Sequence, residues 1–288
     1  MGICEGRTVI VTGAGGGLGR AYAQALVAEG ANVVVNDIVA DAASAVAGQL
    51  GAKALANHDD ITSTQGATRI VDAAVSRFGD VHAVVNNAGV VRDRMFASMT
   101  EEDWDLVIKV HLKGHFCITN TLVKRWRDQH KAGRKVDARI VNTSSGAGLQ
   151  GSVGQANYAA AKGGIASLTL VQAAELARYG ITANALAPAA RTGMTEAVFA
   201  DMMKKPEAGF DHYSPDNVAP LVVWLCSPLS GGVTGKVFEV EGGKLSIAQG
   251  WRTGAVIDKK ARWSPAELTD VVGRLVAEAP KPQKVYGT

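Results

Sequence analysis

Short aliphatic runs alternate with helix-period segments along most of the chain. The aliphatic runs, rich in Val and Ile, predict strands at residues 7–12, 31–37, 54–61, 81–89, 138–145, 181–188 and 235–243. Between them, apolar residues recur at the spacing of one helix face, which predicts helices at residues 19–30, 41–50, 64–77, 101–128, 155–180 and 218–228. Unbroken aliphatic strands between helices are typical of a parallel sheet covered on both faces. The pattern therefore predicts a doubly wound, Rossmann-type α/β fold.

The carboxy-terminal part of the chain departs from this alternation. Ser264 to Glu267 form a capping box with proline at the first helical position, which predicts the start of a helix. The apolar stripe of this helix consists of Leu268, Val271, Val272, Leu275 and Val276. Such a stripe is expected to cover its own domain or a neighbouring subunit. We thus predict one domain over residues 1–250 and a helical extension over residues 251–288.

A long segment at residues 189–217 has an uneven pattern and contains Pro206 and Pro215. Loops of this length inside a compact domain are commonly functional. Because the segment follows a predicted strand, we expect it to lie beside the carboxyl ends of the strands. A lid or a substrate loop is the predicted role.

Composition narrows the class of protein. The chain of 288 residues is 47% apolar, and its net charge of +3 is too small for a nucleic-acid surface. The basic residues within 124–135 are interrupted by acidic and apolar neighbours, which favours a solvated helix end over a binding patch. The widely spaced Cys4, Cys117 and Cys226 indicate reduced thiols, and no apolar run reaches the length of a membrane span. We expect a cytoplasmic protein without nucleic-acid or membrane partners.

A glycine-rich loop, TGAGGGLG at residues 12–19, follows the first predicted strand and opens the first helix. Gly13, Gly17 and Gly19 allow a tight turn and a close approach of the backbone to a pyrophosphate. The amino terminus of the helix adds N–H donors and a favourable dipole. In this strand–turn–helix context, the motif predicts a dinucleotide-binding site.

Acidic and amide side chains follow the next strands. Asp37 closes the second predicted strand, 24 residues after Gly13. A carboxylate at this place accepts hydrogen bonds from a ribose diol and repels a 2′-phosphate, so the expected cofactor is NAD. Asp60, at the end of the third predicted strand, can meet an adenine amino group or cap the following helix. In the NNAG stretch, Asn86 and Asn87 are expected to tie neighbouring strand ends together.

A serine, a tyrosine and a lysine follow the fifth predicted strand. Tyr158 comes thirteen residues after Ser145, and Lys162 stands one helical turn beyond Tyr158 on the same face. A free tyrosine has a pKa of about 10, and a nearby ammonium lowers the pKa of a phenol by stabilising the phenolate. Tyr158 is therefore a candidate base for a secondary alcohol, with Ser145 orienting the substrate oxygen.

The order and spacing of TGxxxGxG, NNAG and Ser-x12-Tyr-x3-Lys resemble the short-chain dehydrogenase/reductase family over about residues 5–250. Within it, stretches such as NNAGVVRDRMF and GQANYAAAKGG are similar to the (3R)-hydroxyacyl-CoA dehydrogenase domain of peroxisomal multifunctional enzyme type 2. The resemblance implies an NAD-dependent oxidoreductase that interconverts (3R)-hydroxyacyl-CoA and 3-ketoacyl-CoA in fatty-acid or sterol-side-chain β-oxidation. It also implies a homodimer or homotetramer.

Some positions depart from the family pattern. Where the family usually carries asparagine in the fourth helix, this chain has His111, which we take to replace that asparagine in the proton path. His115 lies one helical turn beyond His111, but no third ligand stands at a suitable spacing, so no metal site is expected. Ala189 follows Pro188 where the family often has glycine. Thr192 is the candidate residue to contact the carboxamide of the nicotinamide.

The expected site residues divide between catalysis and cofactor binding. The catalytic set is Ser145, Tyr158, Lys162 and His111. The cofactor-binding set is Gly13, Gly15, Gly17, Leu18, Gly19, Asp37, Asp60, Ile61, Asn87, Ala88, Gly89, Tyr158, Lys162, Pro188 and Thr192. Candidates for binding the phosphates of CoA are Arg92, Arg94, Lys204 and Lys205.

Two other functions remain open on the sequence alone. The same residues fit a steroid dehydrogenase of the 17β-hydroxysteroid type, or another secondary-alcohol dehydrogenase. A non-catalytic NAD-binding scaffold belongs to a different class, and the intact Ser145, Tyr158 and Lys162 argue against it. Turnover of CoA esters compared with free sterols separates these functions.

Overall fold

In the computed structural model, the described residues are 2–193, 201, 203–283 and 285. They form an eight-stranded sheet with the strand order β3-β2-β1-β4-β5-β6-β7-β8. The strands are β1 (Thr8–Thr12), β2 (Asn32–Asn36), β3 (Ala54–Asn57), β4 (Ala83–Asn86), β5 (Ala138–Thr143), β6 (Ile181–Ala189), β7 (Val237–Glu241) and β8 (Lys244–Ile247). Neighbouring strands from β3 to β7 pair in parallel, so the predicted doubly wound α/β fold is confirmed.

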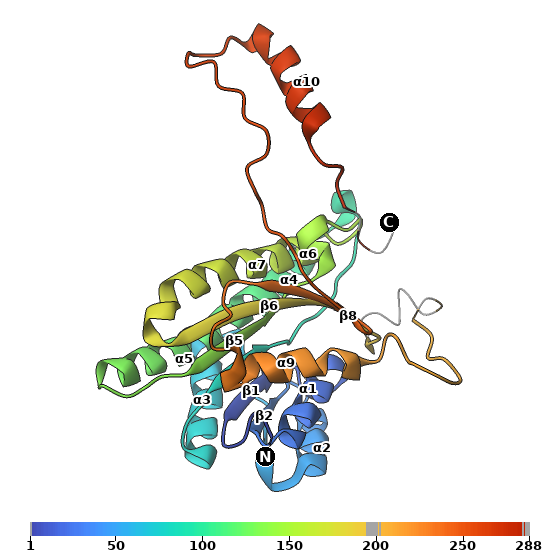
Figure 1. Cartoon of the computed structure of the whole chain (residues 1–288). Helices are drawn as coiled ribbons and strands as arrows, with labels where there is room; N and C mark the ends of the chain where they lie inside the picture. The colour runs from blue at the N-terminus through green and yellow to red at the C-terminus, as the bar shows by residue number, and fades with distance from the viewer. Residues whose placement is uncertain (1, 194–200, 202, 284, 286–288) are drawn as a thin grey trace.

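Helices cover both faces of the sheet (Figure 1). The α-helices are α1 (Gly17–Ala28), α2 (Ala40–Leu50), α3 (Thr64–Phe78), α4 (Glu101–Ile108), α5 (Gly114–Lys131), α6 (Gly146–Gln150), α7 (Ala156–Leu176), α9 (Ala219–Cys226) and α10 (Leu268–Glu278). Val9 and Val33 point into the core beneath α1, α2 and α9. The next residues, Ile10 and Val34, point into the core beneath α3, α5 and α7. Because both strand faces are buried, the strands read as unbroken aliphatic runs.

The predicted last strand at residues 235–243 is in fact a hairpin of two strands. β7 ends at Glu241, and Gly242 and Gly243 turn the chain back into β8, which pairs antiparallel with β7. Gly242 has a φ of +56°, a conformation that favours glycine. The sheet is therefore parallel except at this edge. A glycine pair between two apolar runs is a hairpin signal, so the sequence did contain the information.

The predicted long helix at residues 101–128 is interrupted near its middle. α4 ends at Ile108, a π-helical turn η3 spans Lys109–Lys113, and α5 continues to Lys131. A π-helical turn inserts one extra residue into the helix and is frequent at functional sites. This turn carries His111, whose side chain is buried.

The carboxy-terminal extension forms the predicted helix but leaves most of its apolar stripe uncovered. The capping box is present, with the Ser264 N–H donating to Glu267 Oε2 at 2.7 Å. Val271 is buried, whereas Val272 and Val276 are exposed. Figure 1 shows α10 standing away from the sheet. A neighbouring subunit as the cover for this stripe stays a prediction, and so does the domain boundary. No helix in the described part of the chain is long and apolar enough to cross a membrane.

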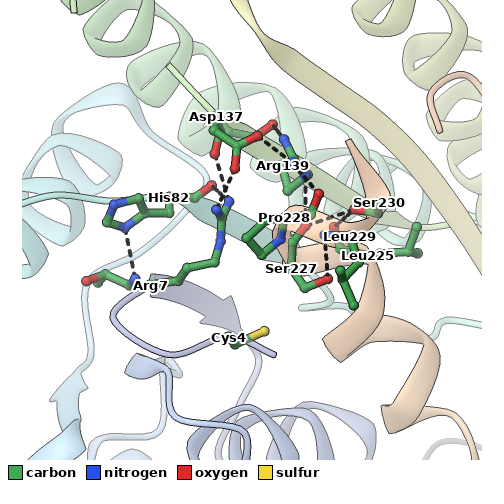
Figure 2. A network of polar contacts seen from close by, with 12 residues as sticks. Cys4, Arg7, His82, Asp137, Arg139, Leu225, Ser227, Pro228, Leu229 and Ser230 are labelled. Atoms are coloured by element: carbon green, nitrogen blue, oxygen red, sulfur yellow. Dashed lines mark hydrogen bonds and ion pairs between the residues drawn. The ribbon is translucent and has the colours of Figure 1, made fainter. Parts of the chain in front are cut away.

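Polar side chains hold the amino-terminal edge of the sheet together (Figure 2). Arg7 and Arg139 are both buried, and both pair with Asp137, which directly precedes β5. Arg139 also donates to the carbonyl oxygen of Ser227, at the end of α9. Arg7 donates to the carbonyl oxygen of His82, which directly precedes β4. One carboxylate thus bridges two buried guanidiniums, and their hydrogen bonds join the starts of β1, β4 and β5 to α9.

Removing Arg139 should destabilise the fold strongly. Arg139→Ala leaves a cavity in place of a buried side chain and removes its hydrogen bonds to the Ser227 and Ala138 carbonyls, so the free energy of unfolding should fall by about 2–5 kcal/mol. Urea denaturation at neutral pH measures the change. Arg127→Ala is the matched control, because the Arg127 side chain is 41% exposed and pairs with Asp128 on the surface. The control should lose less than about 1 kcal/mol, and an equally small loss for Arg139→Ala would contradict the prediction.

Candidate active site

The carboxyl ends of β4 and β5 are joined by buried amides at one edge of the sheet. Asn86 in β4 donates to Asn142 Oδ1 in β5 at 2.9 Å and to Thr119 Oγ1 in α5 at 2.8 Å. Asn142 in turn donates to Thr169 Oγ1 and Gln172 Oε1 of α7. These bonds fix α5 and α7 to the strand ends, and α7 carries two of the predicted catalytic residues.

The loop between β1 and α1 is packed tightly at two of its glycines. A Cβ on Gly13 would stand 2.7 Å from the Cα of Ala88, and one on Gly19 would stand 2.1 Å from the Gly13 carbonyl oxygen. Asn87 donates to that same carbonyl at 3.1 Å, which confirms the expected tie between the end of β4 and this loop. Gly16, the N-cap of α1, has no side chain to cap the first turn. A helix start of this kind offers its N–H groups to an anion such as a pyrophosphate.

Asp37 lies immediately after β2, beside the glycine loop. Its Oδ2 accepts from the Gly15 N–H at 2.9 Å, and its Oδ1 accepts from the Val39 N–H at 3.0 Å. Each carboxylate oxygen keeps a second lone pair that a ribose hydroxyl can use. The close approach needs glycine at position 15, because a Cβ there would stand 2.7 Å from the Cβ of Ala42. The geometry therefore suits a ribose diol.

Asp60 is exposed and does not cap α3, so that interpretation of the sequence was wrong. Its carboxylate accepts from the N–H and the Oγ1 of Thr62, both at 2.8 Å. The N-cap of α3 is Ser63, whose Oγ accepts from a first-turn N–H at 3.1 Å. The strand before it, β3, ends at Asn57, earlier than the sequence predicts, so Asp60 lies in the connecting loop. Ile61, which follows it, is buried.

Two segments carry the predicted catalytic residues other than His111. Ser145 follows β5 and is the N-cap of α6, where its Oγ accepts from the Ala147 N–H at 3.2 Å. Tyr158 and Lys162 lie one turn apart on α7, with Lys162 Nζ 5.5 Å from the centre of the Tyr158 ring. Lys162 is buried, and its Nζ donates to the Thr143 carbonyl oxygen at 2.7 Å. Burial lowers the pKa of Lys162 to about 7.

His111 packs against Tyr158 from the π-helical turn. The two rings meet edge to face, with centroids 5.2 Å apart. His111 Nε2 lies 2.7 Å from the Val90 carbonyl oxygen and 3.0 Å from the Val90 nitrogen, so the ring holds this backbone in either tautomer. Glycine is required at position 89, because a Cβ there would stand 2.3 Å from the imidazole Cε1. Burial, and then the Lys162 charge, lower the pKa of His111 to about 3, so the ring is neutral.

His115, the second histidine of the predicted pair, is buried on α5 close to His111. Burial is the main cause that lowers the pKa of His115 well below its ordinary value, so this ring is also neutral. Among the residues that the structure describes, no group of three or more His, Cys, Asp or Glu side chains could hold a metal ion. The histidine pair thus stands without a third ligand there.

The chain beyond β6 passes close to the glycine loop. Thr192 Cγ2 lies 3.5 Å from the position that a Cβ on Gly17 would take, so Thr192 lies beside the glycine loop. Pro188 lies within β6, which extends one residue beyond the predicted strand, to Ala189. Within the predicted substrate loop, residues 194–200 and 202 lie outside the described residues.

The two arginines considered for the phosphates of CoA are paired with a carboxylate. Arg94 Nε lies 2.5 Å from Asp103 Oδ2, and Arg92 Nε lies 4.0 Å from Asp103 Oδ1. Asp103 belongs to the acidic first turn of α4, together with Glu101 and Glu102. These surroundings do not favour a phosphate, because the arginine charges are balanced by acidic neighbours. Lys204 and Lys205 are exposed.

The family model described as short chain dehydrogenase matches residues 7–203, a range that contains the glycine loop and the Ser145, Tyr158 and Lys162 constellation. The chain belongs to the short-chain dehydrogenase family. The resemblance to this family that the sequence motifs indicated is therefore confirmed. The chain is an oxidoreductase of this family.

Two relatives of the short-chain dehydrogenase are close over almost the whole chain. It is 45% identical to hydroxyacyl-CoA dehydrogenase ChsB1 of Mycobacterium tuberculosis, over 92% of this chain and 87% of that protein. It is 39% identical to peroxisomal multifunctional enzyme type 2 of Mus musculus, over 98% of this chain and 38% of that protein. The predicted similarity to the second protein is confirmed, and this chain corresponds to well under half of its length.

Solved structures show the same fold. A short chain dehydrogenase from Mycobacterium avium has a TM-score of 0.91 and 55% identity, and the match covers 100% of both chains. The 3-ketoacyl-(acyl-carrier-protein) reductase from Brucella melitensis, complexed with NADH, has a TM-score of 0.75 and 32% identity over 83% of this chain and 98% of that chain. Because the first match spans the whole chain, the carboxy-terminal extension has a counterpart there.

Two groups beside the predicted catalytic residues were not predicted from the sequence. Ser144 Oγ donates to the carbonyl oxygen of Lys162 at 2.8 Å, and the Thr143 carbonyl receives the Lys162 ammonium. The only sequence signal for Ser144 was its position beside Ser145. Nothing in the sequence pointed to the Thr143 carbonyl, because the way in which α7 crosses β5 decides which backbone oxygen a lysine meets.

Replacing Lys162 by methionine should change how stability depends on pH. Because the folded-state pKa of Lys162 is about 7, below its unfolded value, the unfolded state binds more protons between these two pKa values. Wild-type stability should therefore rise with pH, from about pH 7 to the unfolded lysine pKa of about 10.4, relative to Lys162→Met. Thermal denaturation across this window measures the difference.

Lys53→Met is the control for this experiment, because the Lys53 side chain is 43% exposed. Its stability should follow the wild type at a constant offset. Parallel pH curves for the wild type and Lys162→Met would contradict the buried, weakly basic ammonium.

Proposed function

We propose that the protein is an NAD-dependent oxidoreductase that interconverts (3R)-hydroxyacyl-CoA and 3-ketoacyl-CoA in fatty-acid or sterol-side-chain β-oxidation. The observation that carries the proposal is the stacking of Tyr158 and a buried Lys162 on one face of α7. Ser144, next to Ser145, is bonded to the Lys162 backbone, so the serine lies at the same strand end. The names of two relatives, a hydroxyacyl-CoA dehydrogenase and a peroxisomal multifunctional enzyme, support an acyl-CoA substrate.

The proposed mechanism divides the work among four side chains. When bound, NAD supplies the acceptor for the hydride. Tyr158 takes the proton of the substrate hydroxyl, because the neighbouring Lys162 ammonium stabilises a phenolate. Ser145 donates a hydrogen bond to the substrate oxygen and stabilises the charge that develops on it. In the reverse direction Tyr158 returns the proton to the carbonyl oxygen. His111, in place of the family's asparagine, keeps its proposed place in the proton path beside Lys162.

We further propose that the cofactor is NAD rather than NADP. A nicotinamide cofactor is supported by the family and by the NADH in the reductase from Brucella melitensis. The Asp37 carboxylate accepts hydrogen bonds from ribose hydroxyls in this position and repels a 2′-phosphate. The next residues, Ile38 and Val39, are exposed and uncharged. The residues that would hold NAD are Gly13, Gly15, Gly17, Leu18, Gly19, Asp37, Asp60, Ile61, Asn87, Ala88, Gly89, Tyr158, Lys162, Pro188 and Thr192.

We also propose a homodimer or homotetramer. Phe116 on α5 and Leu170 and Val171 on α7 are exposed on the helices that cover one face of the sheet. Exposed apolar side chains that gather on a surface mark an association site. The uncovered stripe of α10 is a second surface of this kind. The cytoplasmic location inferred from the sequence stays a prediction.

Turnover of CoA esters tests the substrate class. The purified protein with NAD should produce NADH from (3R)-hydroxyacyl-CoA, measured by NADH absorbance. Tyr158→Phe should keep NAD affinity and lose about 10²–10⁴-fold in turnover, the range that general-base catalysis supplies. Free sterols form the comparison. If they alone are oxidised, the enzyme is a steroid dehydrogenase instead, and full activity of Tyr158→Phe would exclude the mechanism.

Replacing Asp37 by asparagine should move the cofactor preference toward NADP. The amide keeps an acceptor for the Gly15 N–H but removes the charge that repels a 2′-phosphate. The ratio of kcat/KM for NAD to that for NADP should fall about tenfold or more, which corresponds to about 1.4 kcal/mol. Asp41→Asn, in the first turn of α2, is the matched control and should keep the ratio. A wild type that prefers NADP would refute the assignment.

A further inference from the structure

Asn157, the residue immediately before Tyr158, is completely buried in the first turn of α7. A buried primary amide has two N–H groups and one oxygen to satisfy. Asn157 Nδ2 donates to the carbonyl oxygens of Arg92 at 3.0 Å and Asp103 at 3.1 Å. Its Oδ1 accepts from the Tyr158 N–H at 2.7 Å. Because two carbonyls face the nitrogen, only one orientation of the amide satisfies all three groups.

These bonds join three segments at the start of α7. The two carbonyls belong to the segment after β4 and to the first turn of α4. The Tyr158 N–H lies in the first turn of α7, where N–H groups have no helical acceptor one turn earlier. The Gly154 carbonyl, four residues before Tyr158, accepts instead from the Arg94 N–H at 2.8 Å. Asn157 therefore supplies the acceptor that the helix itself does not.

The segment after β4 is also held by His111. His111 Nε2 contacts the backbone of Val90, and the His111 ring packs edge to face on Tyr158. Asn157 binds the same stretch two residues further on, at Arg92. The neighbours of Tyr158 on both sides, His111 and Asn157, thus bind the same backbone stretch, at Val90 and Arg92. A shift of that stretch would move both the ring contact and the helix start.

We propose that Asn157 is a positioning residue for Tyr158, because its three hydrogen bonds fix the start of α7 against the segment after β4 and the first turn of α4. The proposal rests on the proposed function, in which Tyr158 is the base. Without the amide, two carbonyls and the Tyr158 N–H lose their partner, and the helix start can shift. A displacement of about 1 Å near reacting atoms can cost about 10²-fold in rate. The loss should fall on kcat, since the three hydrogen bonds of Asn157 do not involve the glycine loop or Asp37, which would hold the cofactor.

Asn157→Ala and Asn184→Ala form a matched pair for the test. Asn184 in β6 is also buried, and it too bonds to backbone on both sides: Nδ2 donates to the Val233 carbonyl at 2.8 Å, and Oδ1 accepts from the Lys236 N–H at 3.1 Å. Thermal denaturation should show a comparable loss of stability in both variants. Only Asn157→Ala should lose kcat, by about 10²-fold, with KM for substrate and cofactor unchanged. A wild-type kcat in Asn157→Ala, or an equal loss in both variants, would overturn the proposal.

Asn157→Ser covers the case in which the alanine variant does not fold. Its shorter hydroxyl keeps a polar group near the Tyr158 N–H, so an intermediate kcat is expected. A crystal structure of either variant gives a readout that does not depend on the substrate. The Tyr158 ring should be displaced relative to Ser145, and an unmoved ring would overturn the proposal.

The kinetics use whichever secondary alcohol the wild type oxidises. Absence of turnover with every CoA ester would therefore count against the proposed function alone. The Asn157 comparison would then be made with the alcohol that is oxidised, and the crystallographic readout would stand in either case.

Discussion

A buried amide pair, Asn86 in β4 and Asn142 in β5, holds the sheet and the helices around the site in one register. The two residues are opposite each other in the parallel ladder, and their amide nitrogens also donate to Thr119 in α5 and to Thr169 and Gln172 in α7. Hydrogen bonds inside a low-dielectric core are strong, and leaving any of these amides unpaired would be costly. These bonds fix α7 on the sheet. The positions of Tyr158 and Lys162 near the strand ends therefore depend on hydrogen bonds in the core.

Stability and chemistry lie at opposite edges of the sheet. At the amino-terminal edge, Asp137 forms ion pairs with both Arg7 and Arg139. At the carboxyl edge, Lys162 is buried beside neutral histidines, and its Nζ donates to the Thr143 carbonyl rather than to a carboxylate. A buried ammonium without a carboxylate partner destabilises the fold, which is why its pKa is lowered. In the proposed mechanism this cost has a use, because the Lys162 charge stabilises the Tyr158 phenolate.

Local signals in the sequence account for the predictions that succeeded and for some that failed. Aliphatic runs and the glycine loop correctly located the strands from β1 to β6 and the first helix, although β3 ends earlier than predicted. Gly242 and Gly243 were a readable hairpin signal that was overlooked. Asp60 does not cap α3 because the helix begins at Thr64, where Ser63 is the N-cap, and the Asp60 carboxylate accepts from Thr62 instead. The π-helical turn was not predicted, although one inserted residue shifts the apolar face of the following turns by about 100°.

The chain alone determined the order of strands and helices, the glycine loop, the family and the spacing of Ser145, Tyr158 and Lys162. These properties are local, since they follow from neighbouring residues and from the two periods of helix and strand. Tertiary structure alone decided that His111 holds the backbone at Val90, that Lys162 loses its solvent, and that Asn157 joins three segments at Tyr158. Each of these depends on which groups from distant parts of the chain meet in the core, and burial then sets their hydrogen bonds and pKa values.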